Sequence, residues 1–458
     1  MAARKAIYLG TFAHCKTLQE LEICPNGAIG VDEIGVIAFV DRHVKDTSGL
    51  EFRPGWEDAE IVAASESSFF FPGFIDTHIH ASQYPNAGIF GNSTLLDWLN
   101  IYTFPLEGSF TSLSKASRIY NRVVSRTLSH GTTTATYHAT IHVPATNLLA
   151  DICKQKGQRA FVGRVCMDRM SPDYYRDENP ETAVRDSRAC IEHVRSIDPK
   201  FELITPVITP RFAPSCSEAS LRGLGELHEE TGVPCQTHIS ENKSEVALVK
   251  ELFPKAKSYT HVYDDCGLLT SKMILAHAVY LSEEERALIK TRDAKISHCP
   301  ASNTALTSGA ARIRDLLDRG ITVGLGTDVS GGYSPSILEE ARQAMLVSRH
   351  VAMQDGDGAK LSTEEVLYLA TRGGARVVGL EDKIGGFEVG MDWDAQMVRL
   401  GTVSGDGQGD LDTGLVELFG GEDWSECVAK WLYTGDDRNT VAVWVKGRLV
   451  HQVATYRP

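Results

Sequence analysis

A long apolar run is missing from this sequence. Nowhere in its 458 residues is there an uninterrupted stretch of the ~18 apolar residues that a membrane-spanning helix needs. The first residues include the basic pair Arg4 and Lys5, but no apolar segment of the length found in secretory signal peptides. We therefore expect a protein without a membrane partner.

An excess of positive charge is missing as well. Lys and Arg number 46 against 60 Asp and Glu, which leaves a net charge of −14. Binding of nucleic acid through its phosphates needs a basic surface, so we expect no nucleic-acid partner.

Paired cysteines are the third absence. The ten cysteines are scattered singly between Cys15 and Cys427, with no C-x-x-C pair. In a chain of this length, such spacing is typical of reduced and buried thiols, and it predicts a cytoplasmic protein of the cytosol.

The middle of the chain contains a regular alternation of strand-like and helix-like segments. Apolar residues recur at intervals of three and four in the segments between the strand-like runs. The strand-like runs cover residues 68–78, 132–137, 159–167, 202–210, 233–239, 273–277, 295–298 and 321–327. Such alternation predicts an α/β protein with a parallel sheet, closed into a (β/α)₈ TIM-like barrel over residues 69–384. The unusually long connection from His78 to Thr132 is expected to carry function.

The two ends of the chain differ from the middle. Residues 1–68 and 385–458 consist of short alternating runs separated by turn residues. We predict that both ends together form one small β-sandwich domain.

The motif His78-Ile79-His80 at the end of the first predicted strand indicates a metal site. Side chains two residues apart on a strand point to the same side, so both imidazoles can reach one ion. The carboxyl end of the strands is also where barrel enzymes place their active sites.

Three further residues of metal-binding type end later predicted strands. His238, His277 and Asp328 follow the fifth, sixth and eighth runs. Imidazole and carboxylate ligands together suit Zn²⁺ or Fe²⁺, and an open position on such an ion activates water. Glu241, three residues after His238, is well placed to move protons between this water and a substrate.

These residues resemble the amidohydrolase superfamily and, within it, the guanine deaminase family. The wider resemblance rests on His78-Ile79-His80, on the later strand-end residues and on the block 297–303. The narrower one rests on blocks spread over residues 70–445, listed here as 72–84, 96–99, 102–105, 131–135, 157–163, 209–212, 238–242, 326–333, 384–390 and 435–439.

The resemblance implies a zinc-dependent hydrolysis of guanine to xanthine and ammonia, as in purine catabolism. It implies that His78, His80, His238 and Asp328 hold zinc. It implies that His277 holds the catalytic water and Glu241 shuttles protons, with Asp328 assisting. It implies that Gln83, Arg211 and Phe212 bind the purine next to His238, Glu241, His277 and Asp328. It also implies a homodimer.

One absence bears on the number of metal ions. Two-metal members of the superfamily have a bridging lysine at the end of the fourth strand, whereas residues 208–211 here read Ile-Thr-Pro-Arg. We therefore expect one Zn²⁺ per chain, with Fe²⁺ as the less favoured ion.

Two alternatives stay open at this point. A related amidohydrolase acting on 8-oxoguanine, an S-adenosylhomocysteine-like compound or a triazine would carry the same metal residues. A non-enzymatic scaffold derived from the family is the other alternative, although no predicted ligand is missing.

Three other histidines are interpreted as structural. His138 and His142 follow the second predicted strand and are expected to be hydrogen-bonded, and His298 is expected to bond a ligand from behind. The segments 107–110 and 168–180 match no family block, and they are candidates for the pocket mouth or the dimer contact.

Overall fold

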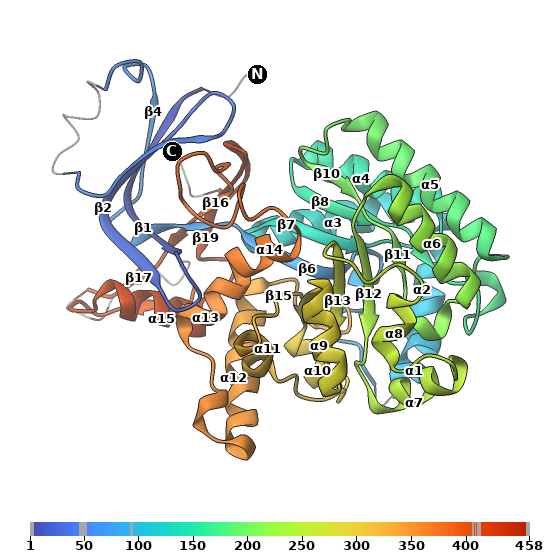
Figure 1. Cartoon of the computed structure of the whole chain (residues 1–458). Coiled ribbons are helices and arrows are strands. Elements are labelled where there is room, and N and C mark those ends of the chain that lie inside the picture. Colours follow the sequence, from blue (N-terminus) through green and yellow to red (C-terminus); the bar gives the residue numbers. More distant parts are fainter. Residues whose placement is uncertain are drawn as a thin grey trace.

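Two parallel four-stranded sheets form the centre of the molecule (Figure 1). This computed structural model describes residues 4–44, 53–91, 95–404, 407, 409 and 414–454, and parts of the predicted end domain lie outside them. The first sheet contains β6 (Phe74–His80), β7 (Thr132–His138), β8 (Arg159–Gly163) and β10 (Ile204–Pro206). The second contains β12 (Cys235–Ile239), β13 (Met273–His277), β14 (Lys295–His298) and β15 (Val323–Leu325). The strands follow chain order in both sheets, which confirms the predicted α/β class.

Backbone hydrogen bonds connect the two sheets at both edges, as a (β/α)₈ barrel requires. At one edge, Gln236 N donates to Ile208 O (2.9 Å). At the other, Asp328 N donates to His78 O (2.8 Å). The second junction joins β6 to the residues just after β15, so it brings two predicted metal-binding segments side by side.

Helices cover the outside of these sheets, and their ends follow local sequence signals. Gly157 and Gly232 end α4 and α6 in the left-handed conformation that an L side chain disfavours. Asn242 and Glu245 form a capping box that begins α7 directly after β12. The covering helices are α3 (Leu113–Ser129), α4 (Val143–Lys156), α5 (Pro180–Ile197), α6 (Glu218–Thr231), α7 (Lys243–Leu252), α8 (Tyr259–Asp264), α9 (Glu283–Arg292), α10 (Pro300–Ala305), α11 (Ile313–Asp318), α12 (Ile337–Asp355), α13 (Thr363–Tyr368) and α14 (Gly374–Val377).

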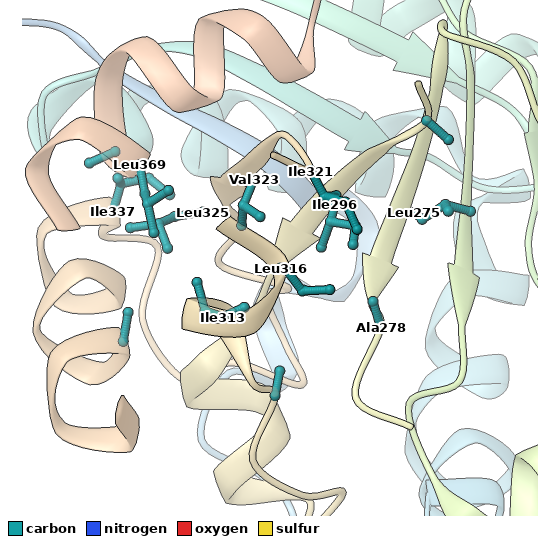
Figure 2. Packing of buried hydrophobic residues seen from close by; sticks show 14 of the residues in the cluster. Leu275, Ala278, Ile296, Ile313, Leu316, Ile321, Val323, Leu325, Ile337 and Leu369 are labelled. Carbon is teal, nitrogen blue, oxygen red and sulfur yellow. The ribbon is translucent and has the colours of Figure 1, made fainter. Parts of the chain in front are cut away.

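Buried aliphatic residues pack helix α11 against the second sheet. Figure 2 shows Ile296, Val323 and Leu325 of the sheet against Ile313 and Leu316 of α11. The removal of such side chains from water is the main source of stability for the layer that carries the strand-end residues.

The first predicted strand is two strands, and this is a difference from the sequence prediction. Residues 68–72 form β5 (Ser68–Pro72), which pairs with the end sheet, and only β6 joins the central sheets. The switch occurs within two residues, because Gly73 N donates to Asp394 O and Phe74 N donates to Gly131 O. A side chain at position 73 would collide with Thr133, 2.2 Å away, so glycine permits this close crossing.

Both ends of the chain contribute to one eight-stranded sheet, seen in blue and red on one side of Figure 1. Its strands are β1 (Ala6–Cys15), β2 (Leu21–Val31), β3 (Ile37–Asp41), β4 (Glu60–Ala63), β5, β16 (Ala395–Arg399), β19 (Thr440–Val445) and β20 (Arg448–Gln452). Arg159 at the start of β8 connects this sheet to the central sheets through ion pairs with Asp392 and Asp394.

The helix α15 (Trp424–Thr434) was not predicted in this region. The boundaries 1–68, 69–384 and 385–458 stay a proposal, and the pairing of β5 favours Gly73 as the first crossing point.

Short elements complete the structure. The pairs β9 (Val165–Cys166) with β11 (Thr209–Pro210) and β17 (Gly401–Thr402) with β18 (Glu417–Leu418) are two residues long each. The long connection after β6 contains a short 3₁₀ helix (Ala81–Asn86), α1 (Leu95–Trp98) and α2 (Phe104–Gly108). No described helix has the length and apolar character needed to cross a membrane.

Candidate active site

Four side chains of metal-binding type meet at one end of the central strands. One ligand atom from each of His78, His80, His238 and Asp328 lies within 4.8 Å of the others. Asp328 Oδ1 is 3.1 Å from His78 Nε2 and 3.2 Å from His80 Nε2. His80 Nε2 is 3.1 Å from His238 Nε2. The four residues predicted to hold zinc are therefore brought together, and their donor atoms converge on one point.

Left-handed backbone occurs at the strand ends around this cluster and, within the cluster, at Asp328. Ser240, His277, Ala278 and Asp328 all have positive φ, between 46° and 73°, although none is glycine. Such backbone costs of the order of 1–3 kcal/mol per residue and is typical of functional sites. Hydrogen bonds orient two side chains of the cluster. Ser302 Oγ donates to Asp328 Oδ2 (2.6 Å), and His238 Nδ1 lies 2.6 Å from Arg211 O.

Burial and charge give the ligands the protonation states that a cation prefers. Burial lowers the pKa of His78 to about 4, although Asp328 opposes the shift. Burial also lowers the pKa of His238 well below its usual value. For Asp328 burial acts in the opposite sense, but hydrogen bonds from His78 and His80 outweigh it and hold its pKa well below the usual range. Neutral imidazoles and an ionised carboxylate are the forms that bind a metal.

Glu241 and His277 lie beside this cluster as a second, acid–base pair. Glu241 Oε2 is 3.6 Å from His277 Nε2, which is itself 3.8 Å from Asp328 Oδ2. Ser308 Oγ donates to Glu241 Oε1 (2.7 Å), and His277 Nδ1 lies 2.9 Å from Asn303 Oδ1. Burial raises the pKa of Glu241. Burial opposes protonation of His277, but the nearby carboxylates Glu241 and Asp328 outweigh it and raise its pKa.

A pocket opens beside both groups. It is lined by His80, Gln83, Leu95, Trp98, Leu99, Arg211, Phe212, His238, Glu241, Leu306 and Asp328. Gln83, Arg211 and Phe212, predicted to bind the purine, line this pocket with His238, Glu241 and Asp328. His277, also predicted to lie at the purine, is fully buried and is not among the lining residues. The apolar residues of α1 and the turn after it form one wall, so the long connection after β6 does shape the site.

Glu107 belongs to the segment 107–110, which was a candidate for the pocket mouth, but its role was not predicted. It lies in α2, its side chain is fully buried, and its Oε2 accepts a hydrogen bond from Arg211 Nη1 at 2.6 Å. Its Oε1 accepts a bond from Gln83 Nε2 (2.8 Å). No sequence signal pointed to this pairing, because Arg211 is 104 positions away.

The other histidines do not all behave as predicted. His142 Nε2 lies 3.3 Å from Gly108 O, as expected for a structural residue. His138 is fully buried, and neither ring nitrogen finds a hydrogen-bond partner among the described residues. Its ring lies 4.6 Å from that of His78 and 4.5 Å from that of His80. His298 is also buried without a partner in the described part of the chain, so both expected hydrogen bonds are absent there.

The unmatched segment 168–180 lies behind the pocket. Tyr175 is fully buried and its ring contacts Phe104 and His142. Asp177 pairs with Arg164 and accepts a hydrogen bond from Met167 N. The buried part of the segment 168–180 therefore packs against α2, the helix that contains Glu107.

Comparisons with known proteins agree with this geometry. The Amidohydrolase family matches residues 69–450. A probable guanine deaminase of Schizosaccharomyces pombe is 48% identical over 447 residues, which cover 97% of this chain and 83% of that protein. The guanine deaminase of Homo sapiens is 42% identical over 447 residues, 97% of this chain and 96% of that protein.

A solved structure gives the same result. The guanine deaminase from C. acetobutylicum, with guanine bound in its active site, superposes with a TM-score of 0.88. It is 34% identical and the match covers 98% of this chain and 100% of that one.

Proposed function

Since the chain belongs to the amidohydrolase family, and within it to the guanine deaminases, we propose that it hydrolyses guanine to xanthine and ammonia. The observation that carries the proposal is one pocket lined by two kinds of residue. Gln83 and Arg211, named here the purine-binding wall, offer hydrogen bonds to a planar ring, and Glu241 lines the same pocket with His80, His238 and Asp328. The comparisons support a hydrolase acting on C–N bonds.

We infer that His78, His80, His238 and Asp328 hold one Zn²⁺ per chain. The fit rests on their chemistry, since two buried imidazoles, the half-buried imidazole of His238 and one carboxylate converge within 4.8 Å. Fe²⁺ takes the same donor types and is the less favoured ion. Bound there, Zn²⁺ supplies a Lewis acid that lowers the pKa of water to about 7 and so provides hydroxide at neutral pH.

The chain's own acid–base groups account for the proton movements. Glu241, with Asp328 and His277, takes a proton from the attacking water and passes it to ring N3 as oxygen adds to C2 of guanine, so that C2 is more electrophilic during the attack. Asp328 then takes the proton of the hydroxyl group on the tetrahedral C2. This proton passes to the amine, the C2–N bond breaks as the C2=O bond forms, and ammonia leaves. The raised pKa of Glu241, caused by burial, suits a group that must both accept and donate.

Arg211, Gln83 and Phe212 are the residues that would recognise the purine. The Arg211 fork matches adjacent acceptors such as O6 and N7 of guanine. The Gln83 amide can give and accept a hydrogen bond at the ring edge. The Phe212 ring can pack against the purine, and it already contacts His238 at a centroid distance of 6.4 Å.

We also propose that the protein is a cytosolic homodimer. All ten cysteines are free and buried, which suits a reducing compartment. Light scattering coupled to size exclusion would report the oligomeric state directly.

The experiment that tests the proposed function measures three quantities on one sample. Loss of guanine absorbance, release of ammonia and bound metal are determined for the purified protein, with 8-oxoguanine, S-adenosylhomocysteine and a triazine as competing substrates. We expect conversion of guanine at about one zinc per chain. Zinc without guanine conversion would overturn the substrate assignment, and a protein that neither holds nor regains zinc would overturn the enzyme itself.

A further inference from the structure

We propose that Glu107 keeps the purine-binding wall electrically neutral, so that the pocket retains the neutral substrate guanine and rejects the xanthine anion. The inference rests on the proposed function and assigns Glu107 as a positioning and specificity-determining residue. It acts on the purine through Arg211 and Gln83.

The contacts of Glu107 place it behind both purine-binding residues at once. Arg211 Nη1 donates to Oε2 (2.6 Å) and Nη2 donates to Oε1 (3.4 Å), while Gln83 Nε2 donates to Oε1 (2.8 Å). All three side chains are at most 3% exposed. Glu107 does not line the pocket itself, whereas Arg211 and Gln83 do.

This arrangement uses only part of the hydrogen-bonding capacity of the wall. A guanidinium has five N–H donors, of which the pair uses two. The amide of Gln83 is also fixed, because Ser330 N and Oγ both approach its Oε1, at 3.3 Å and 3.4 Å. Both side chains are therefore oriented before a purine arrives, which lowers the entropy cost of binding.

The charge balance follows from the groups that surround Glu107. The groups face it from several elements: Arg211 directly follows β11, His80 ends β6, His142 precedes α4, Tyr120 lies in α3 and Tyr175 lies in the segment behind the pocket. Burial raises the pKa of both tyrosines and lowers that of His142, so these three stay neutral near pH 7. Among the described residues, Arg211 and Glu107 thus form the buried ion pair of this wall, with a net charge of zero.

The neutral wall should affect the binding of the product xanthine more than that of the substrate guanine. Guanine is neutral near pH 7, whereas xanthine loses a proton much more readily and becomes an anion. A buried, unpaired Arg211 would attract that anion strongly, because a charge pair in a low-dielectric pocket is worth far more than in water. With Glu107 in place, Arg211 can donate hydrogen bonds without offering a net charge, and ionised product is released.

The test compares Glu107→Gln with a matched control in the zinc-loaded protein. Glu365→Gln removes another buried carboxylate that pairs with an arginine, Arg314, far from the pocket lining. Inhibition by xanthine and turnover of guanine are measured across the pH range in which xanthine ionises. For Glu107→Gln we expect xanthine to bind at least about tenfold tighter, with the gain confined to pH values above its pKa, and a raised KM for guanine. Glu365→Gln should show neither change.

Two further measurements keep the inference falsifiable if Glu107→Gln folds poorly. The double variant Glu107→Gln/Arg211→Gln removes both charges, so the pH-dependent gain for xanthine should vanish. In the unmodified protein, xanthine inhibition should not strengthen as xanthine ionises. Inhibition that strengthens in the unmodified protein, or a Glu107→Gln variant whose affinity for xanthine keeps the original pH dependence, would overturn the inference.

Failure of the proposed function is distinguishable from failure of this inference. A zinc-loaded protein that leaves guanine unchanged refutes the function. A protein that converts guanine normally, with no change in xanthine inhibition in Glu107→Gln, refutes only the role of Glu107.

Discussion

At the scale of single residues, the sequence predicted the groups whose chemistry follows from their position at a strand end. His78, His80, His238 and Asp328 could be found because each directly ends an apolar run, and such ends meet at one face of the sheets. The segment 107–110 was a candidate for the pocket mouth, but the role of Glu107 could not be predicted, because its partner is 104 positions away and nothing local marks a helical glutamate as buried. His138 was misjudged, because hydrogen bonding of a buried imidazole depends on neighbours from other strands.

Glu241 is the residue whose replacement should separate chemistry from metal binding. In Glu241→Gln the carboxyl that moves protons is lost, and its four metal-binding neighbours remain. We expect zinc content to stay at the level of the unmodified protein and kcat to fall by about 10²–10⁴-fold. Metal analysis and steady-state kinetics on the same preparation test this, with Glu365→Gln as the control. Turnover near that of the unmodified protein would refute the shuttle role.

Replacement of His138 should not destabilise the protein, although the residue is buried beside the cluster. Its two ring nitrogens are buried without a partner among the described residues. Replacement by Leu removes both polar atoms at a similar volume, so we expect unchanged or slightly higher stability, within about 1 kcal/mol, and unchanged zinc content. Thermal unfolding and metal analysis measure both. A large loss of zinc in His138→Leu would show instead that the imidazole helps to hold the ion.

At the scale of elements, five of the eight predicted strand positions need only small changes. The runs 159–167 and 202–210 each divide into two short strands, β8 with β9 and β10 with β11. The first run needs a different interpretation. The run 68–78 looked like one strand because its apolar residues are continuous through Gly73. The structure divides it, since the hydrogen bonds of Gly73 and Phe74 go to different sheets. Periodicity reports burial, but it does not report which sheet supplies the partner. The helix α15 was missed because it lies between two strands, β18 and β19, and residues 385–458 were interpreted as strands throughout.

Gly326, which follows β15, tests how tightly two metal-binding segments must pack. A Cβ at this position would lie 2.7 Å from His78 Cβ and 2.5 Å from Ser297 Oγ. We expect Gly326→Ala to lower the free energy of unfolding by about 1–3 kcal/mol and to weaken zinc binding, because His78 must shift. Gly358→Ala is the matched control, since nothing lies within 4 Å of a Cβ there. Denaturant unfolding and competition with a chelator measure the two effects, and equal behaviour of both variants would refute the packing argument.

At the scale of the whole molecule, buried neutral histidines make stability depend on pH. Burial lowers the pKa of His298 to about 3, whereas an unfolded histidine has a pKa of about 6.5. Below about pH 6.5 the unfolded chain therefore binds a proton that the folded chain refuses. The free energy of unfolding must fall as the pH falls from about 6.5 towards 3, by up to about 1.4 kcal/mol per pH unit from this residue.

Replacement of His298 isolates this contribution. In His298→Phe we expect a smaller loss of stability between about pH 7 and pH 5 than in the unmodified protein, by about 1–2 kcal/mol. His193→Gln removes a partly exposed histidine that pairs with Asp151 and serves as the control. Urea unfolding at both pH values provides the measurement, and identical pH dependence in His298→Phe and the unmodified protein would contradict the assignment.

The crossing of the chain at Gly73 has a consequence for the order in which a ribosome can complete this protein. The strand β5 pairs along all five of its residues with β16, but with β1 at only two positions. Gln396 of β16 lies 324 positions after Pro72. The strand that leads directly into His78 and His80 thus stays half-paired until almost the entire polypeptide has been translated. Completion of the pairing of β5 is a late event in biosynthesis, and a chain that terminates before residue 395 carries every predicted zinc ligand but lacks the strand that pairs with β5, the segment leading into two of them.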